Sequence, residues 1–154
     1  MRLTAARILE TRDDASIVLI RLMVGAVFLS EGFQKLIFPT LKGAGFFLQI
    51  GLPLPDILGY WIGSVEMICG AMVLAGFLTR PAVLPLIGII IFAVNLTKIP
   101  LAMDEGFWEA VSEARIDYAM LLGTLFLLIT GGGRWSWDLK HIGPGVSSSD
   151  VSQK

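Results

Sequence analysis

The sequence predicts an all-α integral membrane protein, a bundle of four transmembrane helices with both chain ends on the cytoplasmic side. Hydrophobic residues make up 55% of its 154 residues and charged residues only 16%, whereas soluble domains carry about a quarter charged residues. A single domain of this size cannot hide so much apolar surface from water, so the excess must contact lipid. We expect one transmembrane domain over residues 1–142 and a flexible polar tail over 143–154.

Few residues of this chain can carry out redox or metal chemistry. Cys69 is the one cysteine and His141 the one histidine, so we expect no internal disulfide, bis-histidine haem, copper site or three-histidine zinc site. The net charge of −1 argues against a nucleic-acid partner, because phosphate binding needs a basic surface. Any electron carrier is then a diffusible quinone or belongs to a partner protein.

Four apolar segments fit the length of a membrane-crossing helix, which needs about 20 residues at about 1.5 Å per residue. They are expected at about 16–38, 56–78, 81–100 and 115–130. Pro39 ends the first segment and Gly131 follows the last. The fourth apolar run is short, and we expect it to gain a helical turn from the residues just before it.

The basic residues predict the orientation, because short cytoplasmic loops are enriched in Lys and Arg. With the N-terminus inside, the cytoplasmic side carries Arg2, Arg7, Arg12, Arg80, Arg134 and Lys140. The outer loops hold Lys42 and the acidic residues Asp104, Glu105, Glu109 and Glu113. Tryptophans then fall near both membrane interfaces, Trp135 and Trp137 at the inner one and Trp61 and Trp108 at the outer one.

The two outer connections are more apolar than ordinary loops. Residues 41–54 are too short and too rich in glycine and proline to span, yet too apolar for water, which favours a re-entrant or interfacial segment that roofs the bundle. Between residues 103 and 115 an apolar helical face opposes an acidic one, as in a helix lying in the membrane plane. The two faces are Phe107, Trp108 and Val111, and Glu105, Glu109 and Glu113.

The first three spans each carry a stripe of small and polar residues at helical spacing, a pattern that favours contact between helices over contact with lipid. The stripes are Arg21, Gly25, Phe28, Gly32 and Lys35 in the first, Gly59, Gly63, Glu66 and Gly70 in the second, and Pro85, Gly88, Phe92 and Asn95 in the third. We expect the helices to approach closely around Glu66.

Glu31 and Glu66 are the candidate catalytic residues. Because successive spans run in opposite directions, both carboxylates are expected roughly 10 to 15 Å below the outer boundary, where they can meet. Further polar residues of the outer half are expected to form one polar cluster with them. These are Lys35, Asn95, Lys98, Arg115, Asp117 and Tyr118, and all of them except Arg115 are candidate substrate-binding residues. Arg21, also a candidate binding residue, lies toward the cytoplasmic half, where its long side chain could instead extend to the interface.

Two interpretations of these charges remain open. In the structural one, Glu31 pairs with Lys35, and Glu66 pairs with Lys98 or Arg115, which fixes the register of the helices. In the functional one, the carboxylates exchange protons and the cations hold an anionic or carbonyl group. A charge at mid-membrane costs about 2.5–3.5 kcal/mol on insertion scales, so a purely structural role for several of them would be expensive.

Four segments, in this order and spacing, carry a family resemblance. They are residues 21–36 with Glu31-Gly32-Phe33-Gln34-Lys35-Leu36, residues 45–53, residues 66–80, and Gly131-Gly132-Gly133-Arg134-Trp135-Ser136-Trp137-Asp138. Together they resemble the DoxX family of small bacterial and archaeal four-helix membrane proteins. The resemblance implies a prokaryotic inner-membrane protein associated with quinone-linked oxidoreductases, since one family member is a subunit of a thiosulfate:quinone oxidoreductase and others accompany membrane redox-defence complexes.

We therefore predict a membrane subunit of a quinone-linked oxidoreductase, acting with a protein partner or as a homo-oligomer, with the outer-half cluster as its quinone or small-molecule site. The alternative is a non-catalytic anchor or assembly subunit that recruits a partner and uses its charges only for helix pairing. A transporter is disfavoured, because no inverted repeat is visible. A cavity lined by Glu31 and Glu66 would favour the first prediction, and direct ion pairs without a void the second.

Overall fold

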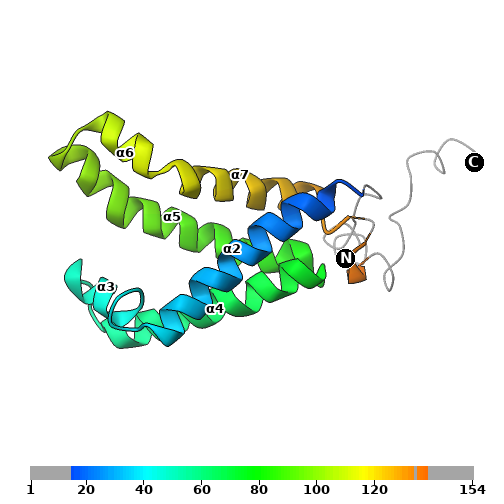
Figure 1. Cartoon of the computed structure of the whole chain (residues 1–154), viewed down its shortest axis with the longest axis horizontal. Helices are drawn as coiled ribbons and strands as arrows, with labels where there is room; N and C mark the ends of the chain where they lie inside the picture. Colours follow the sequence, from blue (N-terminus) through cyan, green and yellow to red (C-terminus); the bar gives the residue numbers. More distant parts are fainter. Residues whose placement is uncertain (1–14, 134, 139–154) are drawn as a thin grey trace, which may run out of the picture.

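All regular secondary structure in the computed structural model, which describes residues 15–133 and 135–138, is helical (Figure 1). The helices are α2 (Ile17–Ile37), α3 (Ala44–Gln49), α4 (Pro55–Ala75), α5 (Thr79–Asp104), α6 (Phe107–Glu113) and α7 (Arg115–Thr130). The described residues contain no strand, and the predicted all-α class is confirmed. His141, Arg2, Arg7, Arg12, Arg134, Lys140 and the 143–154 tail lie outside the described residues.

Three helices, α2, α4 and α5, are long and apolar enough to cross a membrane. α7 has only 16 residues, and α6 comes directly before it. α5 continues through Pro100 to Asp104, although we predicted that this span would end near Pro100. α4 ends earlier than predicted, at Ala75, because Gly76 adopts a left-handed φ of 68°. Glycine takes this conformation without a Cβ clash, which makes it a common helix terminator.

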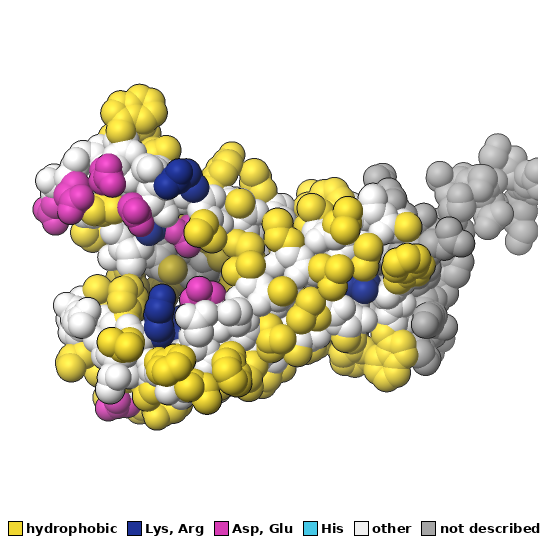
Figure 2. Space-filling model, viewed as in Figure 1, with side chains coloured by type: hydrophobic (Ala, Val, Ile, Leu, Met, Phe, Trp, Pro, Cys, Tyr) yellow, Lys and Arg dark blue, Asp and Glu magenta, His cyan; other side chains and the backbone are white. Residues whose placement is uncertain are grey.

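Apolar side chains cover much of the outer surface of the helices (Figure 2). Leu19, Ile68, Leu84 and Ile129 are exposed on α2, α4, α5 and α7 respectively. Soluble monomers rarely expose continuous apolar surface of this extent. The outside of the molecule is therefore suited to contact with acyl chains.

Four of the helices form two pairs, α2 with α4 and α5 with α7. Glycines bring the first pair together at backbone distance. A Cβ atom on Gly32 would lie 2.5 Å from the carbonyl oxygen of Gly63, and one on Gly70 would lie 2.6 Å from the backbone nitrogen of Leu29. Helices can approach this closely only where side chains are absent. The predicted close approach around Glu66 is confirmed.

The stripe predicted for the third span is wrong. No atom outside α5's own backbone lies within 4 Å of a Cβ built on Gly88, and Pro85 and Asn95 are exposed. α5 instead buries an aliphatic face made of Ala82, Val83, Leu86 and Ile90. The space between the two helix pairs is wider than that within the first pair, and branched side chains fill it where glycines would leave voids.

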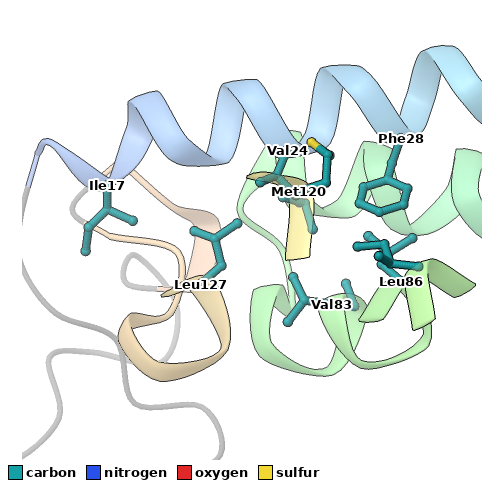
Figure 3. Close-up of a cluster of buried hydrophobic side chains, with 10 residues drawn as sticks. Ile17, Val24, Phe28, Val83, Leu86, Met120 and Leu127 are labelled. Atoms are coloured by element: carbon teal, nitrogen blue, oxygen red, sulfur yellow. The ribbon is translucent and has the colours of Figure 1, made fainter. Parts of the chain in front are cut away.

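The two pairs meet at one end of the molecule and diverge toward the other (Figure 1). At the first end, here named the latched end, α2 begins, residues 76–78 connect α4 to α5, and α7 finishes. Apolar side chains from α2, α5 and α7 pack between the pairs (Figure 3), among them Ile17, Val24, Phe28, Val83, Leu86, Met120 and Leu127. The opposite end, named the loop end, contains residues 38–54 and 105–114.

Short helices stand in both connections of the loop end. α3 buries Phe47 and packs Ala44 against Gly59 of α4. α6 buries Ala110 and exposes Trp108, whereas Glu105 belongs to the C-terminal cap of α5 and not to this helix. The acidic face of the segment is thus shorter than predicted. The re-entrant position of residues 41–54 and the in-plane position of α6 remain predictions.

Candidate binding cavity at the loop end

A cavity lies between the helix pairs where they diverge. It has two adjoining lobes of about 440 and 350 Å³, each within the range of small-molecule sites. Charged side chains from α2, α4, α5 and α7 line both lobes, namely Glu31, Lys35, Glu66, Lys98 and Asp117. Figure 2 shows a hollow at this end, between α3 and α4 on one side and α5 and α6 on the other, with acidic and basic side chains around it.

Glu66 of α4 is almost fully buried, with 3% of its surface exposed. The Nζ of Lys35 donates a hydrogen bond to its Oε2 at 2.7 Å and lies 3.4 Å from Oε2 of Glu31. One lysine therefore bridges two carboxylates. This contact between α2 and α4 follows from the close glycine packing at Gly32 and Gly63. Pairing matters here, because a buried carboxylate without a cation is strongly destabilising.

The partner predicted for Glu66 is wrong. Lys98 forms an ion pair with Asp117 at 3.7 Å, linking α5 to α7, and the Nε of Arg115 donates to the carbonyl oxygen of Ser112. Neither cation pairs with Glu66. The reason is the divergence of the helix pairs, which separates α5 and α7 from α4 at the loop end and leaves α2 as the neighbour of Glu66. The predicted pairing of Glu31 with Lys35 is confirmed.

Asn95 and Tyr118, which we expected in this cluster, line neither lobe. Asn95 is exposed and its Nδ2 donates to the carbonyl oxygen of Ile91 at 2.7 Å, within its own helix. Tyr118 is 63% exposed. Asn95 is two positions from Ala93, and Tyr118 directly follows Asp117; both Ala93 and Asp117 line the cavity. Residues one or two positions apart point to different sides of a helix.

Arg21 lies at the latched end, away from the cavity, and is 5% exposed. Its Nη1 donates to the carbonyl oxygen of Gly132 at 2.7 Å and its Nη2 to that of Trp135 at 3.1 Å. The side chain does not extend to the surface, and Arg21 lines neither lobe of the cavity, so a binding role for Arg21 stays a prediction. Arg21 joins the start of α2 to the segment that follows α7.

Asp138 also lies at the latched end, where it binds the start of α5. Its Oδ1 accepts a hydrogen bond from the backbone N–H of Leu78 at 2.6 Å, and its Oδ2 accepts one from Thr79 at 3.0 Å. Both donors stand at the N-terminus of α5, where the first amides lack helical partners and the helix dipole favours negative charge. Asp138 thus caps α5 from a distant part of the chain.

Comparisons with known proteins identify the family. The DoxX family model matches residues 16–99. A Mycobacterium tuberculosis protein named as an "Uncharacterized membrane protein" is 44% identical over 138 residues, which are 86% of this chain and 85% of that protein. The chain belongs to the DoxX family.

A second DoxX relative carries a functional name. The Bacillus subtilis protein named "Putative oxidoreductase CatD" is 34% identical to this chain over 117 residues, which are 74% of this chain and 78% of that protein. No solved structure matches the chain. The family resemblance read from the sequence is confirmed, and this DoxX chain is a membrane protein.

Sequence reasoning about this DoxX protein missed several lining residues. Lys42, Phe46 and Phe47 line the larger lobe, and Glu113 lines the smaller one. The apolar 41–54 segment was the available signal for the first three, because a segment that roofs a bundle must present side chains to the space below. Asp138 belongs to the terminal motif, but no local pattern connects it to the start of α5.

Proposed function

We propose that this DoxX protein is a membrane subunit of a quinone-linked oxidoreductase and that its cavity holds the quinone head group. The observation that carries the proposal is one cavity offering both kinds of hydrogen-bonding partner, the lysine donors Lys35 and Lys98 and the carboxylate acceptors Glu31, Glu66 and Asp117. A quinone carbonyl accepts hydrogen bonds and a quinol hydroxyl also donates them. The name of the Bacillus subtilis relative also supports an oxidoreductase role.

The bridged carboxylates suit proton exchange. Reduction of a quinone to a quinol takes up two electrons and two protons, and in this proposal the partner subunit supplies the electrons. Glu66 and Glu31 share Lys35, so either carboxylate can give up or take up a proton while the lysine stays paired with the other. Lys98 and Asp117, on the opposite helix pair, would orient the far side of the head group.

We further propose that α2, α4, α5 and α7 all span the inner membrane, with the latched end and both chain ends in the cytoplasm. Exposed tryptophans at both ends support the membrane-spanning position, Trp135 and Trp137 at the latched end and Trp61 and Trp108 at the loop end, since tryptophan is enriched at both membrane interfaces. A reporter active only in the cytoplasm should be active when fused after Lys154. Activity of a periplasm-specific reporter there would reverse the orientation and place the cavity in the inner leaflet.

The decisive variant for the quinone site is Glu66→Gln, which keeps shape and hydrogen bonding but cannot titrate. We expect it to insert and assemble normally and to lower quinone-dependent turnover of the complex about 100-fold, the typical contribution of a general acid–base group. The control is Glu109→Gln, at an exposed position on α6 outside the cavity lining. It should change neither the assembly of the complex nor its quinone-dependent turnover. Full turnover and full thermal protection by quinone in a well-folded Glu66→Gln protein would remove the site from this cavity.

A second candidate function is a non-catalytic anchor or assembly subunit. The observation that favours it is the direct 2.7 Å pair between Lys35 and Glu66, which is what a purely structural role requires. Under this alternative Glu66→Gln leaves turnover unchanged or impairs assembly with the partner, and added quinone does not bind and so gives no protection against unfolding.

A further inference from the structure

The two lobes share the charged side chains but extend in different directions. The larger lobe lies beneath α3 and between α4 and α5, where its walls are mainly apolar and include Phe46, Phe47, Ile62, Phe92 and Leu96. The smaller lobe lies toward α2 and α7 and includes Val27, Ile116, Met120 and the acidic Glu113. The charged side chains therefore lie at the centre of the cavity, and the larger lobe is its more apolar extension.

The larger lobe reaches the outer apolar surface of the molecule. Phe92 and Leu41 both line this lobe, yet they are 39% and 74% exposed. Residues 76–78 connect α4 to α5 at the latched end, and the two helices diverge from there (Figure 1). The larger lobe is therefore open to the outside of the molecule beside Phe92 and Leu41, and its walls on α4 and α5 flank the seam between the helices.

We propose that the cavity is loaded sideways from the lipid phase, through the seam between α4 and α5. Its ligand is then an amphiphile with an uncharged hydrogen-bonding ring and a long apolar chain. This inference rests on the proposed quinone function, which accounts for the ring. It adds the lateral route into the cavity and the position of the apolar chain. The ring lies near Lys35, Glu66 and Lys98, and the chain passes Ile62 and Phe92 into the bilayer. Ile62 and Phe92 are the specificity-determining residues for the chain.

The charges around the larger lobe explain why the ring is uncharged. Three lysines, Lys35, Lys42 and Lys98, face three carboxylates, Glu31, Glu66 and Asp117, so the formal charges of this lobe cancel, and Glu113 of the smaller lobe adds one negative charge. A site without net charge gives no long-range attraction to an ion, but its donors and acceptors still orient a neutral dipolar ring. The hydrophobic effect favours the lateral route. An apolar chain that enters through the seam stays in apolar surroundings, whereas entry from water would expose its methylene groups to water.

A photo-crosslinking experiment on the full chain in lipid nanodiscs tests the route. Phe92 is replaced by p-benzoylphenylalanine, a photoreactive analogue of similar shape, and the nanodiscs of phosphatidylethanolamine and phosphatidylglycerol contain a long-chain menaquinone. The matched control carries the same residue in place of Phe126, which is 41% exposed on α7 and lines neither lobe. Adducts are quantified by intact-protein mass spectrometry. A second substitution, Ile62→Trp on α4, fills the larger lobe and should block the route. If this variant does not fold, Phe46→Trp on α3 is used to fill the same lobe.

The expected result is a menaquinone adduct at position 92 at least about fivefold above that at position 126, reduced to the control level by Ile62→Trp or Phe46→Trp. Equal adducts at the two positions, or adducts at 92 that ignore both filling substitutions, overturn the lateral route. If menaquinone protects the protein thermally but gives no adduct at 92, the proposed function stands and the route fails. If only phospholipid gives an adduct at 92, still suppressed by the filling substitutions, the route stands and the quinone function fails.

Discussion

The latched end and the loop end both bury charged side chains, but they satisfy them in different ways. At the latched end, Arg21 and Asp138 bind backbone carbonyl and amide groups. At the loop end, Lys35 pairs with two other side chains beside a cavity. Backbone partners are held in place by the fold, whereas side-chain partners can rotate and exchange one another for a ligand. The proposed ligand site of this DoxX protein is therefore at the end where the partners of the buried charge are side chains next to a void.

The largest effect is expected from Lys35→Met, which breaks the loop-end network. It leaves Glu66 buried without a cation and should lower the free energy of unfolding in detergent by about 3 kcal/mol. Lys42→Met, at an exposed position on the rim of the same cavity, should have little effect. Unfolding monitored by circular dichroism measures both variants.

A double-mutant cycle sharpens this result. Adding Glu66→Gln to Lys35→Met should restore more stability than adding Glu31→Gln, because the Glu66 side chain is 5% exposed and that of Glu31 is 45% exposed. Strictly additive effects of Lys35→Met and Glu66→Gln would contradict a direct pair between these residues.

A smaller effect is expected where α2 and α4 touch, since this packing places Lys35 over Glu66. Gly32→Ala forces a methyl group against the backbone of Gly63 and Met67 and should cost about 2 kcal/mol through overpacking. Gly88→Ala, with open space around its Cβ position, should be neutral or slightly stabilising, because alanine is the better helix former. Equal melting temperatures for the two variants would show that the helices do not approach at backbone distance.

The smallest effect is expected at the latched end, from Asp138→Asn. The amide keeps one acceptor oxygen but loses the charge and one of two accepted bonds, so we expect a loss of about 1 kcal/mol in stability. Asp104→Asn, at the exposed C-terminal end of α5, is the control. Quinone protection against thermal unfolding should survive Asp138→Asn unchanged. A large loss of that protection at normal stability would show that the two ends are coupled.

The sequence by itself determined the features that depend on composition and on short-range periodicity. The apolar excess predicted a membrane protein, and the glycines at helical spacing predicted the contact faces of α2 and α4 around Glu66. The pair between Glu31 and Lys35 was also predictable, because residues four positions apart meet on one helix. Local rules suffice for these features, since each concerns a single helix or the average solvent around it.

Only the tertiary structure decided which distant groups meet. The lysine that pairs with Glu66 comes from α2 and not from α5 or α7, because the helix pairs diverge at the loop end. The same divergence creates the cavity and brings residues of α3 to its wall. The inward face of α5, the partners of Arg21 and the capping of α5 by Asp138 depend on how helices rotate and cross. Side-chain volumes across the whole core set these rotations, and no local stretch of sequence contains that information.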